Sequence, residues 1–481
     1  MPWAVLLALA LAVAIGVAVP VSPLAGLAFG VVVAGLLVVV GLGHRFVTVF
    51  KVALALLLVG YAFFGRGLAH VGVPPLYLSE MVLGMAVVAF AFSLARARFG
   101  PLHGLLIVFM VWGLARTLPY AGTYGLDAFR DAVTWAYGFF ALTVSITVGR
   151  EDFAVIARWF RRLAPLFLIW VPISAILVYR FGAVLPTAPG SDVPLIFFKG
   201  GDMGVHLAGV GAFVLLGLYG LYGSGHSISE LRIWATWLVA LAVAGAVNRG
   251  GLLAASMATT TSLFVRSSAR WFSLLFVALL LAAAAGLINP TVDVGARRTI
   301  SVEQLASNVF SVLSDNGTEG LQGTKDWRLA WWTDIVNYTF NGPFFWDGKG
   351  YGINLADADG FQVSADHSLR APHNSHIEIL ARSGVPGFAL WVLFQGAFAI
   401  ALVMAAFRAR GAGLPIWTRL MGWLFAYWLA IIVNSSFDPY LEGPQGGIWF
   451  WTIVGLGLAA IRLSREGGDV SIAPPPEPRA T

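Results

Sequence analysis

The 481-residue sequence contains no cysteine, and only 11% of its residues are charged. Without cysteine the chain has no disulfide, no thiolate nucleophile and no cysteine-ligated zinc or iron–sulfur centre. An ordinary soluble domain has about 25% charged residues, so the low charge excludes that class of protein. The net charge of +6 lies mostly in short loops between apolar segments. The sequence has no basic soluble domain, and we therefore expect no nucleic-acid partner.

Long apolar runs make up most of the chain, and 58% of all residues are hydrophobic. Runs of about 18–22 residues recur along the sequence, each long enough to cross a bilayer core of roughly 30 Å. The first run, PWAVLLALALAVAIGVAV, lacks a preceding basic segment and a convincing small-residue cleavage site. We interpret it as a retained span and not as a signal peptide. The sequence predicts an all-α polytopic membrane protein.

The apolar runs predict about 12 to 14 transmembrane helices. The fourteen-span version places them at about 3–20, 23–42, 48–65, 79–95, 101–118, 133–149, 163–180, 204–222, 232–247, 250–265, 271–288, 385–407, 417–435 and 446–463. The ninth and tenth spans are separated only by NRGG. Merging them, or omitting the N-terminal hairpin, gives a smaller number of spans.

The positions of lysine and arginine predict the orientation of these spans. With the N-terminus in the cytoplasm, most basic residues fall in inner loops and few fall in short outer loops. The same alternation divides the chain into four regions. These are transmembrane helices with short loops over 1–288, one large periplasmic loop containing short helices over 289–384, C-terminal transmembrane helices over 385–463, and a disordered cytoplasmic tail over 464–481.

Arg249, in the sequence NRGG, interrupts apolar sequence at an outer membrane boundary. A guanidinium near hydrocarbon costs about 2.5–3.5 kcal/mol, so it is normally paired or lines a cavity. One interpretation is an interfacial arginine that reaches the lipid headgroups. The other is an anion site, in which Gly250 and Gly251 admit a ligand to the backbone. The next helix then offers free N–H groups, and Arg249 adds a bidentate fork suited to phosphate or diphosphate.

Other charged residues at the outer face also have a structural and a functional interpretation. Arg328 lies in DWRLAWWTDIV, an amphipathic stretch whose tryptophans suit a membrane interface. It is either a solvated charge on an interfacial helix or a ligand-binding group. Arg130, with Asp127 and Asp131, forms either a self-satisfied ion-pair cluster or part of a polar cavity. Lys199 and its polar neighbours form a weaker cluster, which we interpret as structural.

His373 is the strongest candidate for chemistry, because an imidazole titrates near neutrality and can act as general base on a hydroxyl. On a helix, His373 and His376 share a face and suggest a metal site with Glu378. Glu378 lies off that face, however, and no acidic or cysteine partner completes the site. The structural alternative for His373 is a capping or loop residue, because Pro-His-Asn is typical of a helix start. Asp438, on the same predicted side, is a candidate to orient His373.

The sequence around His373 resembles a known signature. His373 and Asn374, followed after nine residues by Gly384 and Gly387, match every fixed position of H-[NSQ]-x9-G-x-x-G. This is the signature of the bacterial O-antigen ligase and O-antigen polymerase superfamily. The family has it at the end of a large periplasmic loop, directly before a membrane helix, which is its predicted position here.

Two further features match this family. Arg249 in NRGG resembles the family's Ser-Arg-Gly segment at the periplasmic end of a helix. Arg328, followed by tryptophans, Gly342-Pro343 and GKGYG, resembles the R…W…P…G-x-G run of its loop. The resemblance covers about residues 240–440 in motif detail and the remainder of the chain in hydropathy.

The resemblance implies a metal-independent, inverting glycosyltransferase without a cofactor, with a membrane-embedded, GT-C-like fold. It would lie in the bacterial inner membrane with its active face in the periplasm. The implied donor is a glycan on undecaprenyl diphosphate. Arg249 and Arg328 would contact the diphosphate, and His373 would activate the acceptor hydroxyl. Asn374 and the two glycines of the signature would hold the turn and helix start beside His373.

The signature leaves the acceptor open. Lipid A–core would make the protein an O-antigen ligase, another lipid-linked glycan a polymerase, and a protein hydroxyl an O-oligosaccharyltransferase. A lipid-linked glycan transporter or flippase is the alternative from a different class. It predicts charges in the middle of spans, paired broken helices and repeat symmetry. The polar residues here gather at one face, which favours an enzyme that works at one leaflet.

Overall fold

The computed structural model describes residues 44–73, 76–189, 191–221, 230–265, 270–288, 291–295, 298–301, 305 and 319–471. The spans predicted at 3–20 and 23–42, and the tail from 472 onward, lie outside these residues. Within them the chain is mostly helical, and eight helices are long and apolar enough to cross a membrane. The prediction of an all-α polytopic membrane protein is confirmed.

Helices match the twelve predicted spans that fall within the described residues. They are α3 (His44–Phe64), α4 (Leu78–Ser93), α5 (Pro101–Tyr124), α7 (Val133–Ala136) with α8 (Gly138–Thr147), α9 (Arg150–Phe181), α10 (Gly200–Leu215), α12 (Glu230–Val247), α13 (Arg249–Val265), α14 (Arg270–Ile288), α18 (Ser375–Gly411), α19 (Pro415–Ser435) and α20 (Pro444–Arg465). The two elements that flank NRGG are therefore separate helices, α12 and α13.

Shorter elements connect these helices. The helical ones are η1 (Gly65–His70), η2 (Leu94–Arg96), α6 (Leu126–Asp131), η3 (Gly182–Val184), α11 (Leu218–Leu221), α16 (Glu319–Phe340), α17 (Leu355–Asp359) and η4 (Tyr440–Glu442). Two small antiparallel hairpins pair β1 (Gly72–Val73) with β2 (Leu76–Tyr77) and β3 (Thr291–Gly295) with β4 (Arg298–Ser301).

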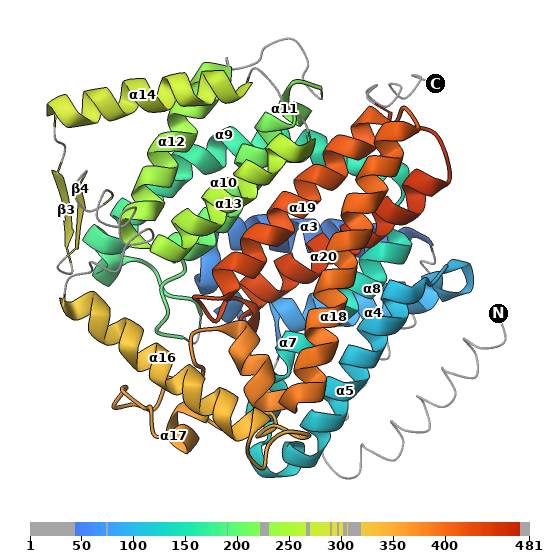
Figure 1. Ribbon diagram of the computed structural model, residues 1–481, viewed down its shortest axis with the longest axis vertical. Helices are drawn as coiled ribbons and strands as arrows, with labels where there is room; N and C mark the ends of the chain where they lie inside the picture. The colour runs from blue at the N-terminus through green and yellow to red at the C-terminus, as the bar shows by residue number, and fades with distance from the viewer. Residues whose placement is uncertain are drawn as a thin grey trace.

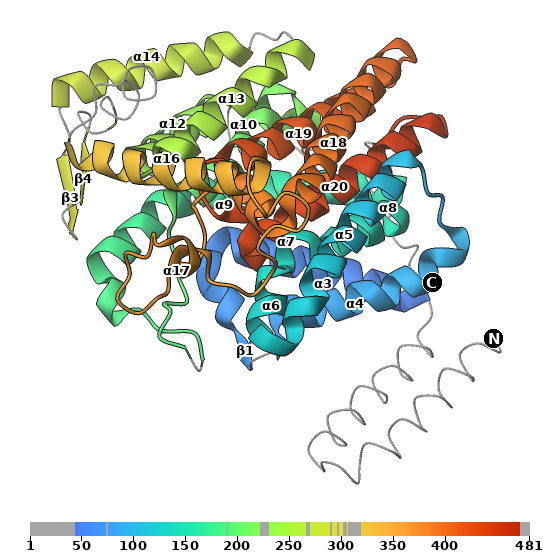
Figure 2. The same ribbon diagram turned by 60° about the horizontal axis from the view of Figure 1, so that its bottom comes forward.

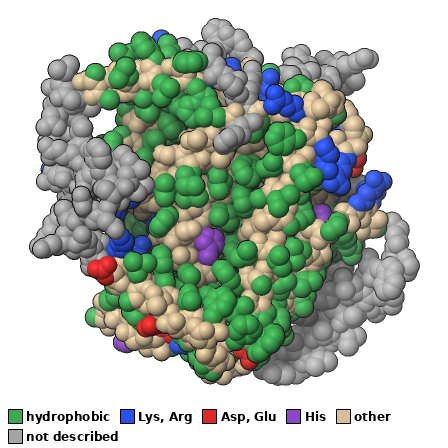
Figure 3. All heavy atoms as spheres, viewed as in Figure 1, with side chains coloured by type: hydrophobic (Ala, Val, Ile, Leu, Met, Phe, Trp, Pro, Cys, Tyr) green, Lys and Arg blue, Asp and Glu red, His purple; other side chains and the backbone are tan. Residues whose placement is uncertain are grey.

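The C-terminal helices form the centre of the bundle. α18, α19 and α20 run side by side, and α10 and α13 pack against α19 (Figure 1). Most of the apolar stretch of α19 and α20 is buried. α16 crosses one end of the bundle, and it lies with α17 on the near side of Figure 2. Hydrophobic side chains cover the middle of the face in Figure 3, with lysine and arginine towards its margins, as expected for a membrane protein.

The other end of the bundle is held by interactions of basic residues. Arg462, in the last turn of α20, donates to the carbonyls of Ser145 and Val148 at 3.2 and 3.1 Å. Lys51 of α3 pairs with Asp152 of α9 at 2.8 Å. Cations near helix C-termini satisfy the last carbonyls and oppose the negative end of the helix dipole.

Two helices begin ten or more residues before their predicted spans. α9 begins at Arg150 and α18 at Ser375, whereas the apolar runs begin near 163 and 385. The hydropathy pattern follows only the apolar part of a helix. In α9, the added turns hold Arg161, whose Nε donates to the Tyr219 carbonyl at 2.8 Å. In α18, the added turns lie before a break at Gly384.

Gly384 interrupts α18 with a non-helical backbone, at φ 66° and ψ −175°. A side chain there would be strained, and an added Cβ would lie 2.6 Å from the Phe345 carbonyl oxygen. That carbonyl accepts a hydrogen bond from the Val385 N–H at 2.7 Å. The Ser383 carbonyl on the other side of the break accepts one from Trp112 Nε1 at 3.0 Å. The break therefore satisfies its backbone groups while it redirects the helix.

A buried ion network fixes the segment of α18 before this break. Arg382 is 1% exposed, and its guanidinium pairs with Glu378 at 2.6 Å and with Asp131 of α6 at 3.0 Å. It also donates to the Ile353 carbonyl at 3.1 Å. Arg370 pairs with the same Asp131 at 3.0 Å. The network joins α18 and α6 to the chain around residue 353.

We predict that Arg382→Met strongly destabilises the protein, because Asp131 and Glu378 would remain buried without their shared cation. Removing one partner of a buried ion pair costs about 3–5 kcal/mol. Unfolding by denaturant in detergent micelles measures the loss. Arg410→Met, at an exposed position near the far end of α18, is the control. A loss below about 0.5 kcal/mol in Arg382→Met, typical of a surface substitution, would contradict the prediction.

Candidate functional site

His373 directly precedes α18 and has a left-handed backbone, with φ 54°. Few residues other than glycine adopt this conformation, although histidine does so more often than most. Two neighbours hold it in place. The Pro372 carbonyl accepts a hydrogen bond from Trp332 Nε1 at 2.7 Å, and the Asn374 side chain caps α18 by accepting from the His376 N–H at 3.0 Å. The position of the imidazole is therefore set from both sides.

Tryptophans of α16 support the same segment. The Trp327 ring lies with its centroid 6.3 Å from that of His373. Trp331 is fully buried, stacks on Phe361 at 5.4 Å and donates to Asp359 at 2.6 Å. The sequence suggested that these tryptophans suit a membrane interface. For Trp331 this was wrong, because it belongs to the small core between α16, α17 and the first turns of α18.

Three charged side chains from other elements act on His373. Burial, together with the charges of Arg328 and Lys199, lowers the pKa of His373 to about 4, although Asp438 opposes the shift. Arg328 donates from Nη1 to the Phe437 carbonyl at 3.1 Å. Lys199 Nζ lies 2.5 Å from Asp438 Oδ1. At neutral pH, His373 is thus an uncharged imidazole, the form that can accept a proton.

Arg249 reaches the same region from the start of α13. The Asn248 side chain caps this helix by accepting from the Gly251 N–H at 2.8 Å. α10 begins beside it, where an added Cβ on Gly204 would lie 2.5 Å from the Gly251 carbonyl oxygen. The charge of Arg249 lowers the pKa of Arg328, as does burial to a larger extent, so the two guanidinium groups lie within electrostatic reach.

The residues around His373 form a site in which cations outnumber the one nearby anion, Asp438. Arg249, Arg328 and Lys199 supply three cations, and α10 and α13 add the positive ends of two helix dipoles. Arg328 Nε is buried without a hydrogen-bond partner among the described residues. Such an arrangement suits a ligand with several negative charges, and a diphosphate is a ligand of this kind.

Other candidates from the sequence lie outside this cluster. Arg130 is 51% exposed and pairs with Asp127 at 3.2 Å and Asp131 at 3.4 Å, so it belongs to the ion network of Arg382. Arg130 is not among the residues that act on His373. Its functional role stays a prediction. Gly387 lets α18 approach α5, because an added Cβ would lie 2.8 Å from Trp112 Nε1. Gly384 and Gly387 therefore shape the break in α18 that follows its first turns.

His376 has a structural position in α18. Its Nδ1 accepts from Trp391 Nε1 at 3.1 Å, so its Nε2 carries the proton and donates to the Ile432 carbonyl at 3.1 Å. Glu378 is paired with Arg382. The described part of the chain holds no group of three His, Asp or Glu side chains arranged for a metal ion.

Lys199 is the member of the cluster that sequence reasoning missed. The sequence suggested a weak cluster of Lys199 with Asp202 and His206, which we interpreted as structural. The structure also pairs Lys199 with Asp438, 239 residues away. One feature of the sequence could have identified Lys199: it lies directly before the apolar helix α10, just as Arg249 lies at the start of the apolar helix α13.

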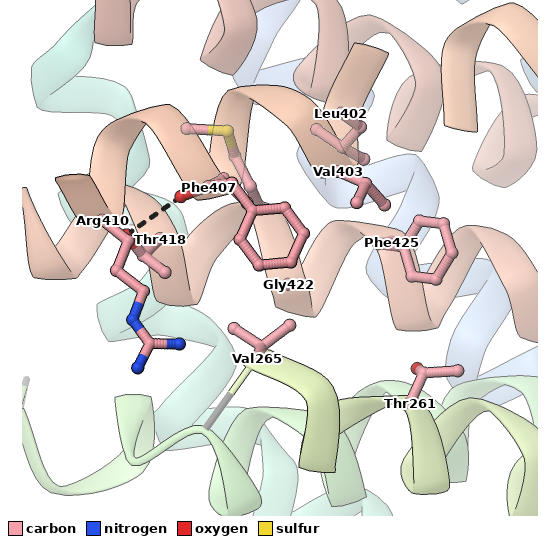
Figure 4. Close-up of a pocket in the computed structure, with 11 residues that line it drawn as sticks. Thr261, Val265, Leu402, Val403, Phe407, Arg410, Thr418, Gly422 and Phe425 are labelled. Carbon is pink, nitrogen blue, oxygen red and sulfur yellow. Dashed lines mark hydrogen bonds between the residues drawn. The ribbon is translucent and has the colours of Figure 1, made fainter. Parts of the chain in front are cut away.

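A separate hollow opens between α13, α18 and α19, with Arg410 at one end (Figure 4). Its volume is about 430 Å³ and its lining is almost wholly apolar. The Thr261 hydroxyl donates to the Ala258 carbonyl of its own helix at 2.6 Å, and the Thr418 hydroxyl donates to the carbonyls of Leu414 and Ala406 at 3.1 and 3.4 Å. The hollow lies towards the C-terminal end of α18, at the other end of that helix from His373.

The part of the chain that matches a known family contains most residues of the cluster. Residues 234–392 match a family model described as O-antigen ligase. The matched range contains Arg249, Arg328 and His373, together with both glycines of the signature. No curated protein matches the chain.

We predict that His373 stays uncharged down to about pH 5 and that Arg328→Gln raises its pKa. The substitution removes a cation that disfavours the imidazolium form. Diethylpyrocarbonate modifies only the neutral ring, so the rate of His373 modification against pH, followed by mass spectrometry, reports the midpoint. Lys51→Gln, at the other end of the bundle, should leave the midpoint unchanged. A wild-type midpoint near the ordinary value of about 6.5 would refute the prediction.

Proposed function

We propose that the chain, whose residues 234–392 match the O-antigen ligase family model, transfers a glycan from undecaprenyl diphosphate to an acceptor hydroxyl. The proposed reaction takes place at the periplasmic face of the bacterial inner membrane. The observation that carries the proposal is the convergence of a neutral imidazole, His373, with the guanidinium groups of Arg328 and Arg249.

In the proposed reaction, the acceptor oxygen attacks the anomeric carbon of the donor sugar while His373 accepts the hydroxyl proton. The bond between the anomeric carbon and the diphosphate oxygen breaks, and its electron pair leaves with the diphosphate. A single displacement of this kind inverts the anomeric configuration. Diphosphate is already a good leaving group, so no general acid is required.

The arginines stabilise the departing charge. Guanidinium groups stay protonated throughout the pH range of the reaction and bind phosphate oxygens through two parallel N–H groups. Arg328 is fixed at the Phe437 carbonyl and Arg249 at the start of α13. Donors fixed before the reaction stabilise charge that develops in the transition state, because they need no reorganisation.

The location of the cluster supports a donor that is anchored in the membrane. His373, Arg249 and Lys199 lie at the starts of α18, α13 and α10, and Asp438 follows α19. These are positions where apolar helices end. A diphosphate attached to a polyprenyl chain would place its charged group at this level while its tail remains in hydrocarbon.

The acceptor hydroxyl belongs to lipid A–core in the ligase version of the proposal and to another lipid-linked glycan in the polymerase version. A protein hydroxyl would make the enzyme an O-oligosaccharyltransferase. These versions share the donor site and the role of His373. They differ in the group that must approach the imidazole from the side opposite the diphosphate.

We predict that His373→Ala and Arg249→Ala each reduce glycan transfer at least about 100-fold, because they remove the base or a fixed cation. The assay uses protein reconstituted with an undecaprenyl-diphosphate glycan and each candidate acceptor, without added metal. Arg410→Ala, at the other end of α18, is the matched arginine control and should retain activity. Full activity of His373→Ala would refute its role as base, and a requirement for added metal would refute the metal-independent mechanism.

A flux assay separates this proposal from a flippase. We predict that liposomes containing the protein do not move a labelled lipid-linked glycan from the inner to the outer leaflet. The polar groups of the proposed site gather at one end of the bundle, whereas a carrier needs a polar path across it. Transport that depends on Arg249, without glycan transfer, would support the flippase alternative instead.

A further inference from the structure

The two side chains of the ion pair between Lys199 and Asp438 differ in solvent exposure. Lys199 Nζ lies 2.5 Å from Asp438 Oδ1, and the side chain of Lys199 is 33% exposed whereas that of Asp438 is 7% exposed. Asp202 and Asp438 raise the pKa of Lys199 above its ordinary value, although burial opposes them. Lys199 therefore carries a full positive charge on a side chain that a ligand can reach.

Of the two carboxylate oxygens of Asp438, Oδ1 contacts Lys199. The other oxygen, Oδ2, is buried without a hydrogen-bond partner among the described residues. The same oxygen lies close to the first turn of α10, where an added Cβ on Gly201 would be 3.3 Å from it. The carboxylate thus occupies the positive end of a helix, beside an ammonium group, where an anionic ligand is favoured.

Asp438 is also joined to the cations of the proposed donor site. Arg328 donates to the carbonyl of Phe437, the residue directly before Asp438. The charge of Asp438 acts on both Arg328 and His373. The carboxylate is therefore placed where it competes with a phosphate oxygen for the same positive groups.

We propose that Lys199 is a third cation for the donor diphosphate and that Asp438 occupies its ammonium group until the donor binds. This inference rests on the proposed function. On donor binding, Lys199 Nζ exchanges the Asp438 carboxylate for a phosphate oxygen, and no covalent bond changes. The released carboxylate then accepts a hydrogen bond from the His373 imidazolium that forms when the acceptor proton is taken. The proton stays on His373.

Coulomb's law supports the direction of this exchange. A diphosphate brings at least two negative charges, whereas Asp438 brings one, so the attraction to the ammonium is larger for the ligand at equal distance. The charged groups that act on His373 come from α16 (Arg328), the start of α10 (Lys199) and the segment after α19 (Asp438). Moving Lys199 towards a phosphate therefore leaves Asp438 as the anion available to the imidazole.

The test measures binding of farnesyl diphosphate to the full-length protein in nanodiscs by calorimetry. Lys199→Gln should weaken binding at least about ten-fold, because it removes a charge-assisted hydrogen bond. Asp438→Asn should tighten binding about ten-fold, because it removes the internal competitor. In the Lys199→Gln background, Asp438→Asn should have little further effect. Lys199→Arg, which keeps the charge, should bind as the wild type does.

Lys51→Gln is the matched control, since Lys51 pairs with Asp152 at 2.8 Å and has a comparable exposure of 27%. It should leave farnesyl diphosphate binding unchanged. An ion pair with a structural role alone predicts instead that Lys199→Gln and Asp438→Asn both weaken binding and both lower the unfolding temperature. That result would overturn the exchange.

The same titrations distinguish failure of this inference from failure of the proposed function. If the wild type does not bind farnesyl diphosphate, or if Arg249→Gln binds it as tightly, the proposed diphosphate site itself is overturned. If the wild type binds and Arg249→Gln weakens binding while Lys199→Gln does not, only the role of Lys199 is overturned. Weaker binding by Lys199→Gln with tighter binding by Asp438→Asn supports the exchange.

Discussion

The ion pairs of Arg382 are the interaction on which the geometry near His373 depends. A fully buried guanidinium is tolerated only with good partners, and Glu378 and Asp131 both lie within 3.0 Å of it. Burial and the nearby Glu378 raise the pKa of Glu442, beside this network, well above its ordinary value. The network fixes the first turns of α18, and His373 directly precedes them.

Except for Arg328, which lies within α16, the site assembles residues that are far apart in the sequence because each lies at or next to an end of its helix. His373 precedes α18, Arg249 opens α13, Lys199 precedes α10 and Asp438 follows α19. Apolar helices that cross a membrane bring their ends to a common level, where polar side chains meet water. Helix N-termini also favour anions. The membrane constraint thus produces the positive cluster without a soluble domain to hold it.

Hydropathy predicted the helices well because it depends on composition within a single segment. Each predicted span within the described residues corresponds to a helix, and the local motifs identified Arg249, Arg328 and His373. Long-range pairs were not predictable in this way. The Lys199–Asp438 and Arg382–Asp131 pairs join residues from distant segments, and neither leaves a periodic pattern. The burial of Trp331 depended on the fold of the loop between α16 and α18.

The low pKa of His373 has a consequence for the timing of the proposed reaction. An imidazole with a pKa of about 4 is neutral but weakly basic, and the cations Arg328 and Lys199 contribute to that weakness. A bound diphosphate would neutralise these charges and so raise the basicity of the ring. His373 would then become an effective base only after the donor is in place. Without the donor, an acceptor or a water molecule at the site would meet a poor base, and this favours an order in which the lipid-linked donor binds first.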